Sequence, residues 1–140
     1  GMDRGLTWDK LATATLNLRA GAVFVGTNPD KTLPTERGIT HGNGAVLAAL
    51  QAATDLTPLI IGKPEPTMYQ LALRRLGVAP GAAAAIGDRL DTDILGAVRA
   101  GMRSVLVLSG VATRADLELS PFQPTWVLED IRAVTRTLRG

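Results

Sequence analysis

Carboxylates gather in one short segment of the chain. Residues 87–94 (GDRLDTDI) hold three aspartates, Asp88, Asp91 and Asp93, directly after an apolar run that predicts a buried strand. Grouped carboxylates repel one another unless a cation offsets their charge. Mg²⁺ suits such oxygen ligands and is usually held by one or two carboxylates, with waters and phosphate oxygens. The segment therefore predicts a magnesium site. The alternative is that Asp91 or Asp93 caps a helix and the other carboxylates are solvated.

A lysine follows the end of another predicted strand. Lys63 comes directly after the apolar run 58–62 (PLIIG), and Pro64 keeps Lys63 out of the helical backbone region. Ligands of open α/β sheets bind beyond the carboxyl ends of the strands. Parallel strands would thus place Lys63 on the same side of the sheet as Asp88. An ammonium there can hold a phosphate and offset charge on a nucleophilic carboxylate. The downstream acidic segment favours this interpretation over an ordinary surface lysine.

Strand-like and helix-like patterns alternate along the chain. Apolar runs predict buried strands at 22–26, 58–62, 83–87 and 104–108, with a further short strand at 125–128. Helices are expected at about 8–20, 43–54, 66–76, 92–100 and 131–138, and a polar loop at 27–40. Such alternation predicts parallel strands joined by helical crossovers. We therefore expect an α/β fold with a Rossmann-like parallel sheet.

Composition and charge narrow the class of protein. The 140 residues are 46% hydrophobic, include no cysteine and carry a formal net charge of +2. Disulfides and thiolate metal sites are therefore excluded. The scattered arginines form no basic block of the kind that indicates nucleic-acid binding. No apolar run approaches the roughly 20 residues that cross a bilayer. We expect a cytoplasmic protein that binds neither nucleic acid nor membrane.

In order and spacing, these segments resemble motifs of the haloacid dehalogenase (HAD) superfamily. Residues 61–64 (IGKP) and 86–94 (IGDRLDTDI) are similar to its motifs III and IV. Three further segments resemble the C2-capped branch of NagD-like, p-nitrophenyl phosphatase and phosphoglycolate phosphatase enzymes: 27–30 (TNPD), 34–38 (PTERG) and 100–111 (AGMRSVLVLSGV). The resemblance covers nearly the whole chain, so it is far more specific than one short motif.

The resemblance implies two parts and an activity. Residues 1–57 would be the second half of a C2-type α/β cap, and residues 58–140 the C-terminal half of the HAD-like core. Enzymes of this branch are magnesium-dependent phosphatases. The implied activity is hydrolysis of a small phosphorylated metabolite, with Mg²⁺ as cofactor.

The resemblance also implies roles for individual residues. Asp88 would be a magnesium ligand, and Asp93 a second acid close to the metal or its waters. Lys63 would contact the phosphate and the nucleophile. Asn28 and Asp30 would lie on a cap loop that faces the active site and helps to choose the substrate.

One family motif is absent from these 140 residues. Catalysis in the family begins with an aspartate of an N-terminal Asp-x-Asp-Gly motif, and no such sequence occurs here. Asp91 and Asp93 have the spacing of the two aspartates, but Ile94 stands where the motif has glycine. The chain is therefore expected to start inside the cap and to be inactive alone. An incomplete core sheet would expose an apolar edge. We expect a homo-oligomer, or pairing with a missing N-terminal segment.

Two other functions stay open. The missing nucleophile favours a non-catalytic α/β module that binds a phosphorylated metabolite or a protein partner, although the intact loops at Lys63 and Asp88 disfavour it. Gly42 and Gly44 before a predicted helix suggest a nucleotide-binding module. Leu47 stands where the third glycine of that fingerprint is needed, which weakens the suggestion.

Overall fold

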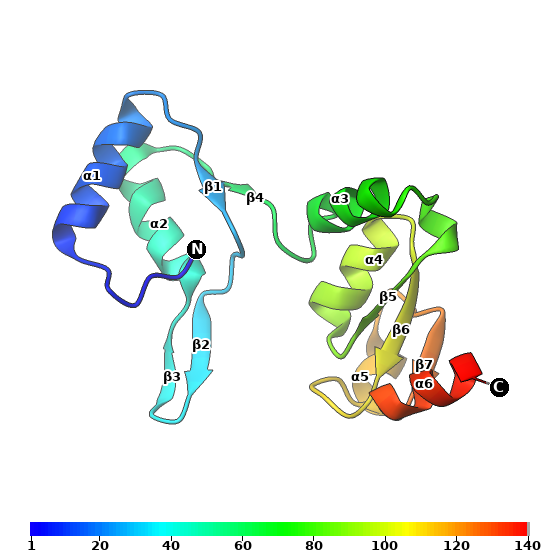
Figure 1. Ribbon diagram of the computed structural model, residues 1–140. Helices are drawn as coiled ribbons and strands as arrows, with labels where there is room; N and C mark the ends of the chain where they lie inside the picture. Colours follow the sequence, from blue (N-terminus) through cyan, green and yellow to red (C-terminus); the bar gives the residue numbers. More distant parts are fainter. Residues whose placement is uncertain (140) are drawn as a thin grey trace. The chain divides into compact units, whose positions relative to one another are not determined.

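The computed structural model describes the backbone of residues 1–139 and the side chains as far as Arg136. The chain divides into two compact units, Gly1–Gly62 and a second unit that starts at Lys63 (Figure 1). Each unit contains its own buried apolar side chains. Within the described range, no helix has the length and apolar character that crossing a membrane requires.

The first unit combines two helices, an antiparallel hairpin and a pair of parallel strands. Its elements in chain order are α1 (Trp8–Arg19), β1 (Val25–Gly26), β2 (Thr32–Thr35), β3 (Gly38–His41), α2 (Asn43–Thr54) and β4 (Leu59–Ile60). β1 pairs in parallel with β4, and β2 pairs antiparallel with β3. Leu18 of α1 and Leu47 and Leu50 of α2 are buried, so the two helices pack through their apolar faces.

Both helices of the first unit confirm the predicted positions. The Thr7 hydroxyl accepts a hydrogen bond from the Lys10 amide (3.3 Å), which caps the start of α1. Gly21, with a φ of +97°, lies just beyond the end of that helix. Asp55 adopts the left-handed conformation at the end of α2.

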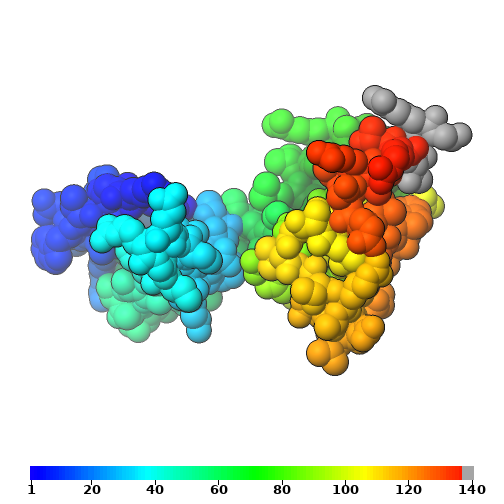
Figure 2. All heavy atoms as spheres, turned by 90° about the horizontal axis from the view of Figure 1, so that it is seen from below, coloured from blue at the N-terminus to red at the C-terminus, as the bar shows by residue number. Residues whose placement is uncertain are grey.

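The expectation of a polar loop at residues 27–40 is wrong for half of that segment. β2 and β3 form a hairpin in which Thr32 lies opposite His41 and Thr35 lies opposite Gly38. All four residues of β3 are exposed, and the hairpin appears in cyan at the surface in Figure 2. A strand that is exposed on both faces shows no alternation of apolar and polar residues. Hydrophobic periodicity therefore gives no strand signal here.

The second unit is built on a three-stranded parallel sheet. Its helices and strands in chain order are α3 (Thr67–Leu76), β5 (Ala84–Gly87), α4 (Leu95–Arg99), β6 (Arg103–Val107), α5 (Arg114–Leu119), β7 (Trp126–Leu128) and α6 (Ile131–Arg139). The strand order is β5-β6-β7, and both neighbouring pairs are parallel. The central strand β6 is buried from its second residue onward, as expected for a parallel strand covered on both faces. The predicted parallel α/β fold is confirmed.

The core of the second unit fixes the loops that follow β5 and β6. Ile94 and Leu106 are fully buried and Ala112 is 6% exposed. The apolar side chains that pack against these three are Leu90, Leu108, Leu117 and Phe122. Because Ile94 ends the acidic segment and Ala112 follows β6, their burial anchors both loops at the carboxyl end of the sheet.

The strand before Lys63 does not join this sheet. β4 was expected to lie in one parallel sheet with the strand before Asp88, and instead it pairs with β1. The Leu59 amide donates to the Phe24 carbonyl (2.8 Å), and the Ile61 amide donates to the Gly26 carbonyl (3.0 Å). The division between the units thus falls after β4. The assignment of residues 1–57 to a cap and 58–140 to a core stays a prediction.

Candidate functional site

Asp88 lies at the carboxyl end of β5, held by the loop that follows β6. The Val111 amide donates to Asp88 Oδ2 (2.9 Å), and the Ala112 amide donates to the Asp88 carbonyl oxygen (2.9 Å). A side chain at position 110 would collide with the Asp88 carboxylate, so glycine at this position leaves room for the carboxylate. Asp88 therefore occupies the position where open α/β sheets bind their ligands.

Asp93 and Lys63 form an ion pair. Lys63 Nζ lies 2.6 Å from Asp93 Oδ1, and the Arg89 amide donates to Asp93 Oδ2 (3.1 Å). The Asp93 side chain is 8% exposed and the Lys63 side chain 47% exposed, so solvent reaches the pair mainly from the lysine side. Any side chain at Gly87 would collide with that of Asp93. The hydrogen bond with Asp93 raises the pKa of Lys63 most, and the charge of Asp88 acts in the same direction. Both predicted carboxylates therefore act on Lys63.

A wide helical turn positions Asp93. Leu90–Ile94 form a π-helical turn ahead of α4, with a hydrogen bond from the Ile94 amide to the Arg89 carbonyl (3.1 Å). The Tyr69 hydroxyl donates to the Asp93 carbonyl (3.2 Å), and burial raises the pKa of Tyr69, so the hydroxyl stays protonated at neutral pH. Turns of this kind inside helices are frequent at functional sites. The helix was expected to start at about residue 92 and begins earlier because of this turn.

The third aspartate lies apart from this arrangement. Asp91 has a side chain that is 68% exposed and accepts hydrogen bonds from the Arg89 guanidinium (3.1 and 3.3 Å). Among the residues described, no three histidine, cysteine or acidic side chains are grouped to hold a metal ion by themselves. Of the three predicted carboxylates, Asp88 and Asp93 thus remain candidates for the magnesium site. Asp91 fits the alternative that its carboxylate is solvated.

Asn28 and Asp30 lie in the first unit, in the loop between β1 and β2. Asn28 Oδ1 accepts from the Asp30 amide (3.2 Å), and the Asn28 carbonyl accepts from Asn43 Nδ2 (2.7 Å). The Gly44 amide donates to the Asp30 carbonyl (2.7 Å), and a side chain at Gly44 would collide with the Pro29 carbonyl. The start of α2 therefore fixes this loop. Glycine at position 44 allows the backbone of α2 to lie close to the backbone of the loop. A role of Asn28 and Asp30 in substrate choice stays a prediction.

Asn43 and Tyr69, which hold these side chains in place, carry little signal in the sequence. Asn43 is only 2% exposed, and buried amides of this kind need hydrogen-bond partners. The available signal for Asn43 was its position, because a polar residue at a predicted helix start often forms hydrogen bonds there. Tyr69 gave no local signal, because its partner Asp93 lies 24 residues further along the chain.

The chain matches known proteins over nearly its whole length. Residues 60–134 match the family model described as HAD-hydrolase-like. The acid sugar phosphatase of Staphylococcus aureus (strain USA300) is 41% identical over 131 residues, which cover 94% of this chain and 51% of that relative. The chain therefore spans about half the length of the curated relatives it matches.

Solved structures give the same result. A double mutant of the thermostable NPPase from Geobacillus stearothermophilus is 42% identical, with a TM-score of 0.82 over 92% of this chain and 51% of that one. The glycerol phosphate phosphatase of Mycobacterium tuberculosis, in complex with magnesium, is 43% identical, with a TM-score of 0.85 over 96% of this chain and 41% of that one. The family match covers more than half of the chain and includes Lys63, Asp88 and Asp93. The resemblance seen in the sequence is confirmed, and the chain belongs to the HAD-hydrolase-like family.

Proposed function

We propose that this chain forms part of a magnesium-dependent phosphatase that hydrolyses a small phosphorylated metabolite. The observation that carries the proposal is the 2.6 Å contact between Lys63 Nζ and Asp93 Oδ1, beside the strand end that leads into Asp88. The relatives support it, since they are an acid sugar phosphatase and a glycerol phosphate phosphatase. The inferred substrate class is therefore a phosphomonoester of a sugar or of a small polyol.

The donor set fits a magnesium ion. Such an ion needs only one or two carboxylates, because waters and phosphate oxygens complete its octahedron. Asp88 Oδ2 accepts from Val111, whereas Asp88 Oδ1 accepts no hydrogen bond from the described residues and suits a ligand role. Both oxygens of Asp93 already accept hydrogen bonds, so Asp93 suits contact with waters of the ion. When bound, Mg²⁺ would offset the negative charge of the phosphoryl oxygens.

Lys63 orients and neutralises the phosphoryl group in this proposal. Its ammonium has three N–H donors, of which Asp93 takes one, so two remain for a phosphate oxygen and the nucleophile. The raised pKa keeps Lys63 charged at physiological pH. Donors that are fixed before the reaction stabilise the charge that develops in the transition state. We assign Asn28 and Asp30 to substrate choice.

A further segment supplies the nucleophile in this proposal. These 140 residues contain no Asp-x-Asp-Gly sequence. Among the described strands, β5 pairs with β6 alone, and Ile86 of β5 is 46% exposed. Open strand edges favour pairing with another strand. We infer that a strand bearing the aspartate nucleophile, from this or another polypeptide, pairs with β5. The 140 residues by themselves are then inactive and prone to associate.

Turnover of p-nitrophenyl phosphate with Mg²⁺ tests the proposal. The 140-residue chain should show no turnover. The same chain should be active when it is joined to the half of the Geobacillus stearothermophilus NPPase that has no counterpart in these 140 residues. In the joined protein, Asp88→Asn should lower turnover by about 100-fold or more. Asp91→Asn removes an exposed carboxylate of the same segment and should change turnover by less than about twofold.

Three results would contradict parts of this proposal. Turnover by the 140-residue chain alone would show that no further segment is needed. Equal activities of the Asp88→Asn and Asp91→Asn joined proteins would remove Asp88 from the site. Phosphate binding without turnover by a folded joined protein would favour a non-catalytic binding module. Light scattering of the 140-residue chain tests association separately, and a folded monomer at high concentration would contradict it.

A further inference from the structure

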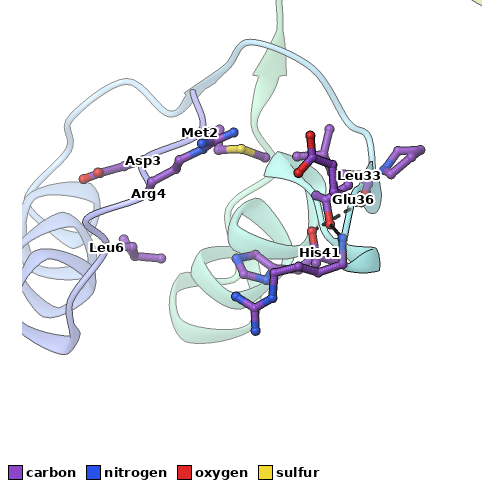
Figure 3. Close-up of a pocket in the computed structure, with 11 residues that line it drawn as sticks. Met2, Asp3, Arg4, Leu6, Leu33, Glu36 and His41 are labelled. Atoms are coloured by element: carbon purple, nitrogen blue, oxygen red, sulfur yellow. Dashed lines mark hydrogen bonds between the residues drawn. The ribbon is translucent and has the colours of Figure 1, made fainter.

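A pocket of about 900 Å³ lies within the first unit, between the N-terminal segment and the β2–β3 hairpin. Figure 3 shows its two walls: Met2, Arg4 and Leu6 come from the N-terminal segment, and Leu33, Glu36 and His41 come from the hairpin. Arg37, at the hairpin turn, also lines the pocket. Apolar and charged groups therefore face the same space, as in sites that bind small molecules.

The charges in this pocket are not balanced. The Asp3 carboxylate is occupied by Lys10, whose Nζ lies 2.7 Å from Asp3 Oδ2, and this contact lowers the pKa of Asp3. Arg4, Arg37 and Glu36 form no ion pair with any residue up to Arg136. The pocket lining thus includes two arginines and one glutamate without an ion-pair partner among these residues, which leaves an excess of positive charge.

We propose that this pocket binds a small organic oxyanion, held through a carboxylate or phosphate group by Arg4 and Arg37. The planar fork of a guanidinium matches two oxygens of such a group at once. The imidazole of His41 lies in the same wall as a further hydrogen-bonding group, and Met2, Leu6 and Leu33 offer apolar surface to the body of the ligand. Every residue of this site belongs to the first unit and none is Lys63, Asp88 or Asp93, so binding there can be tested without phosphate hydrolysis.

The single histidine of the chain makes the proposal directly testable by NMR. Because His41 is the only histidine, its ring signals arise from one site. Inorganic phosphate and acetate are titrated separately, at constant pH and with chloride holding the ionic strength constant. We expect saturable shifts of the His41 signals with at least one probe. Arg4→Gln and Arg37→Gln should each weaken binding by about tenfold or more, because each removes a charge-assisted contact.

Arg75→Gln is the matched control. Arg75 is exposed on α3 in the second unit, so this variant removes the same charge outside the pocket. Saturation with both probes supports a general oxyanion site, and saturation with one identifies the preferred group. Shifts that grow in proportion to concentration, without saturating, overturn the proposal. So do equal dissociation constants for Arg37→Gln and Arg75→Gln in proteins whose amide spectra show an intact fold.

Discussion

Lys63→Met removes the ammonium that faces Asp93 while keeping much of the lysine stem. Removing one partner of a fully buried ion pair costs about 3–5 kcal/mol, whereas an exposed pair contributes about 0–1 kcal/mol. Asp93 is buried, but the Lys63 side chain is 47% exposed, so solvent screens the contact. We therefore expect the variant to lose about 2 kcal/mol in the free energy of unfolding of the second unit.

Urea unfolding followed by Trp126 fluorescence measures this loss. A Trp8→Phe background removes the other tryptophan, which lies in the first unit, so the signal reports on the second unit. Asp93→Asn and the double variant complete a double-mutant cycle, because asparagine keeps an oxygen for the Arg89 amide. We expect a coupling energy between positions 63 and 93 of about 1–2 kcal/mol.

Arg99 and Glu65 provide the control pair in the same unit. Their side chains lie 2.7 Å apart, at nearly the separation of Lys63 and Asp93, but are 44% and 42% exposed. A cycle of Arg99→Met and Glu65→Gln should give a coupling below about 0.5 kcal/mol. If the coupling of Lys63 with Asp93 is no larger than that of the control, burial of Asp93 does not strengthen the contact, and the reasoning is refuted.

Two further predictions concern stability. Leu106→Ala empties a fully buried position of β6 and should cost about 2–5 kcal/mol by urea unfolding; a loss below about 1 kcal/mol would contradict its place in the core. Hydrogen bonds from the Thr113 hydroxyl and amide hold the pKa of Asp116 below its ordinary value of 3.8. The stability that Asp116 contributes is therefore present above pH 3.8 and is lost as the pH falls through the lower folded-state value. The urea midpoints of the unaltered chain and Asp116→Asn should converge below pH 3.8, and a constant difference would contradict this.

Elements with local start and stop signals were predictable. α3 begins after Pro66 and ends at Gly77, which has a φ of +66°, as the sequence indicated. α5 was missed, although Thr113 and Asp116 form the capping box that marks its start. Six residues are too few to display a helical period. The partner of β4 was also missed, because a short apolar run suits any parallel sheet and does not specify its neighbour.

The site was predictable in its residue types but not in its contacts. Family resemblance pointed to Lys63, Asp88 and Asp93. In the structure Lys63 contacts Asp93, and the charge of Asp88 raises the pKa of Lys63. The catalytic roles of the three residues stay predictions. The spacing of the aspartates did not show that Asp91 turns to solvent, because that depends on its ion pair with Arg89. The contact of Lys63 with Asp93 joins residues 30 positions apart, so only the folded chain reveals it.

The π-helical turn at Leu90–Ile94 also limits how the length of this segment can vary. Such a turn encloses one residue more than an α-helical turn. Deleting one residue within it would let an ordinary α-helix continue into α4, and the helix itself would tolerate the loss. Each residue rotates a helix by about 100°, so the two ends of the segment would turn relative to each other and carry Asp88 away from Asp93. A one-residue gap at this turn in a related sequence would thus mark a protein that keeps the fold but places these two carboxylates differently.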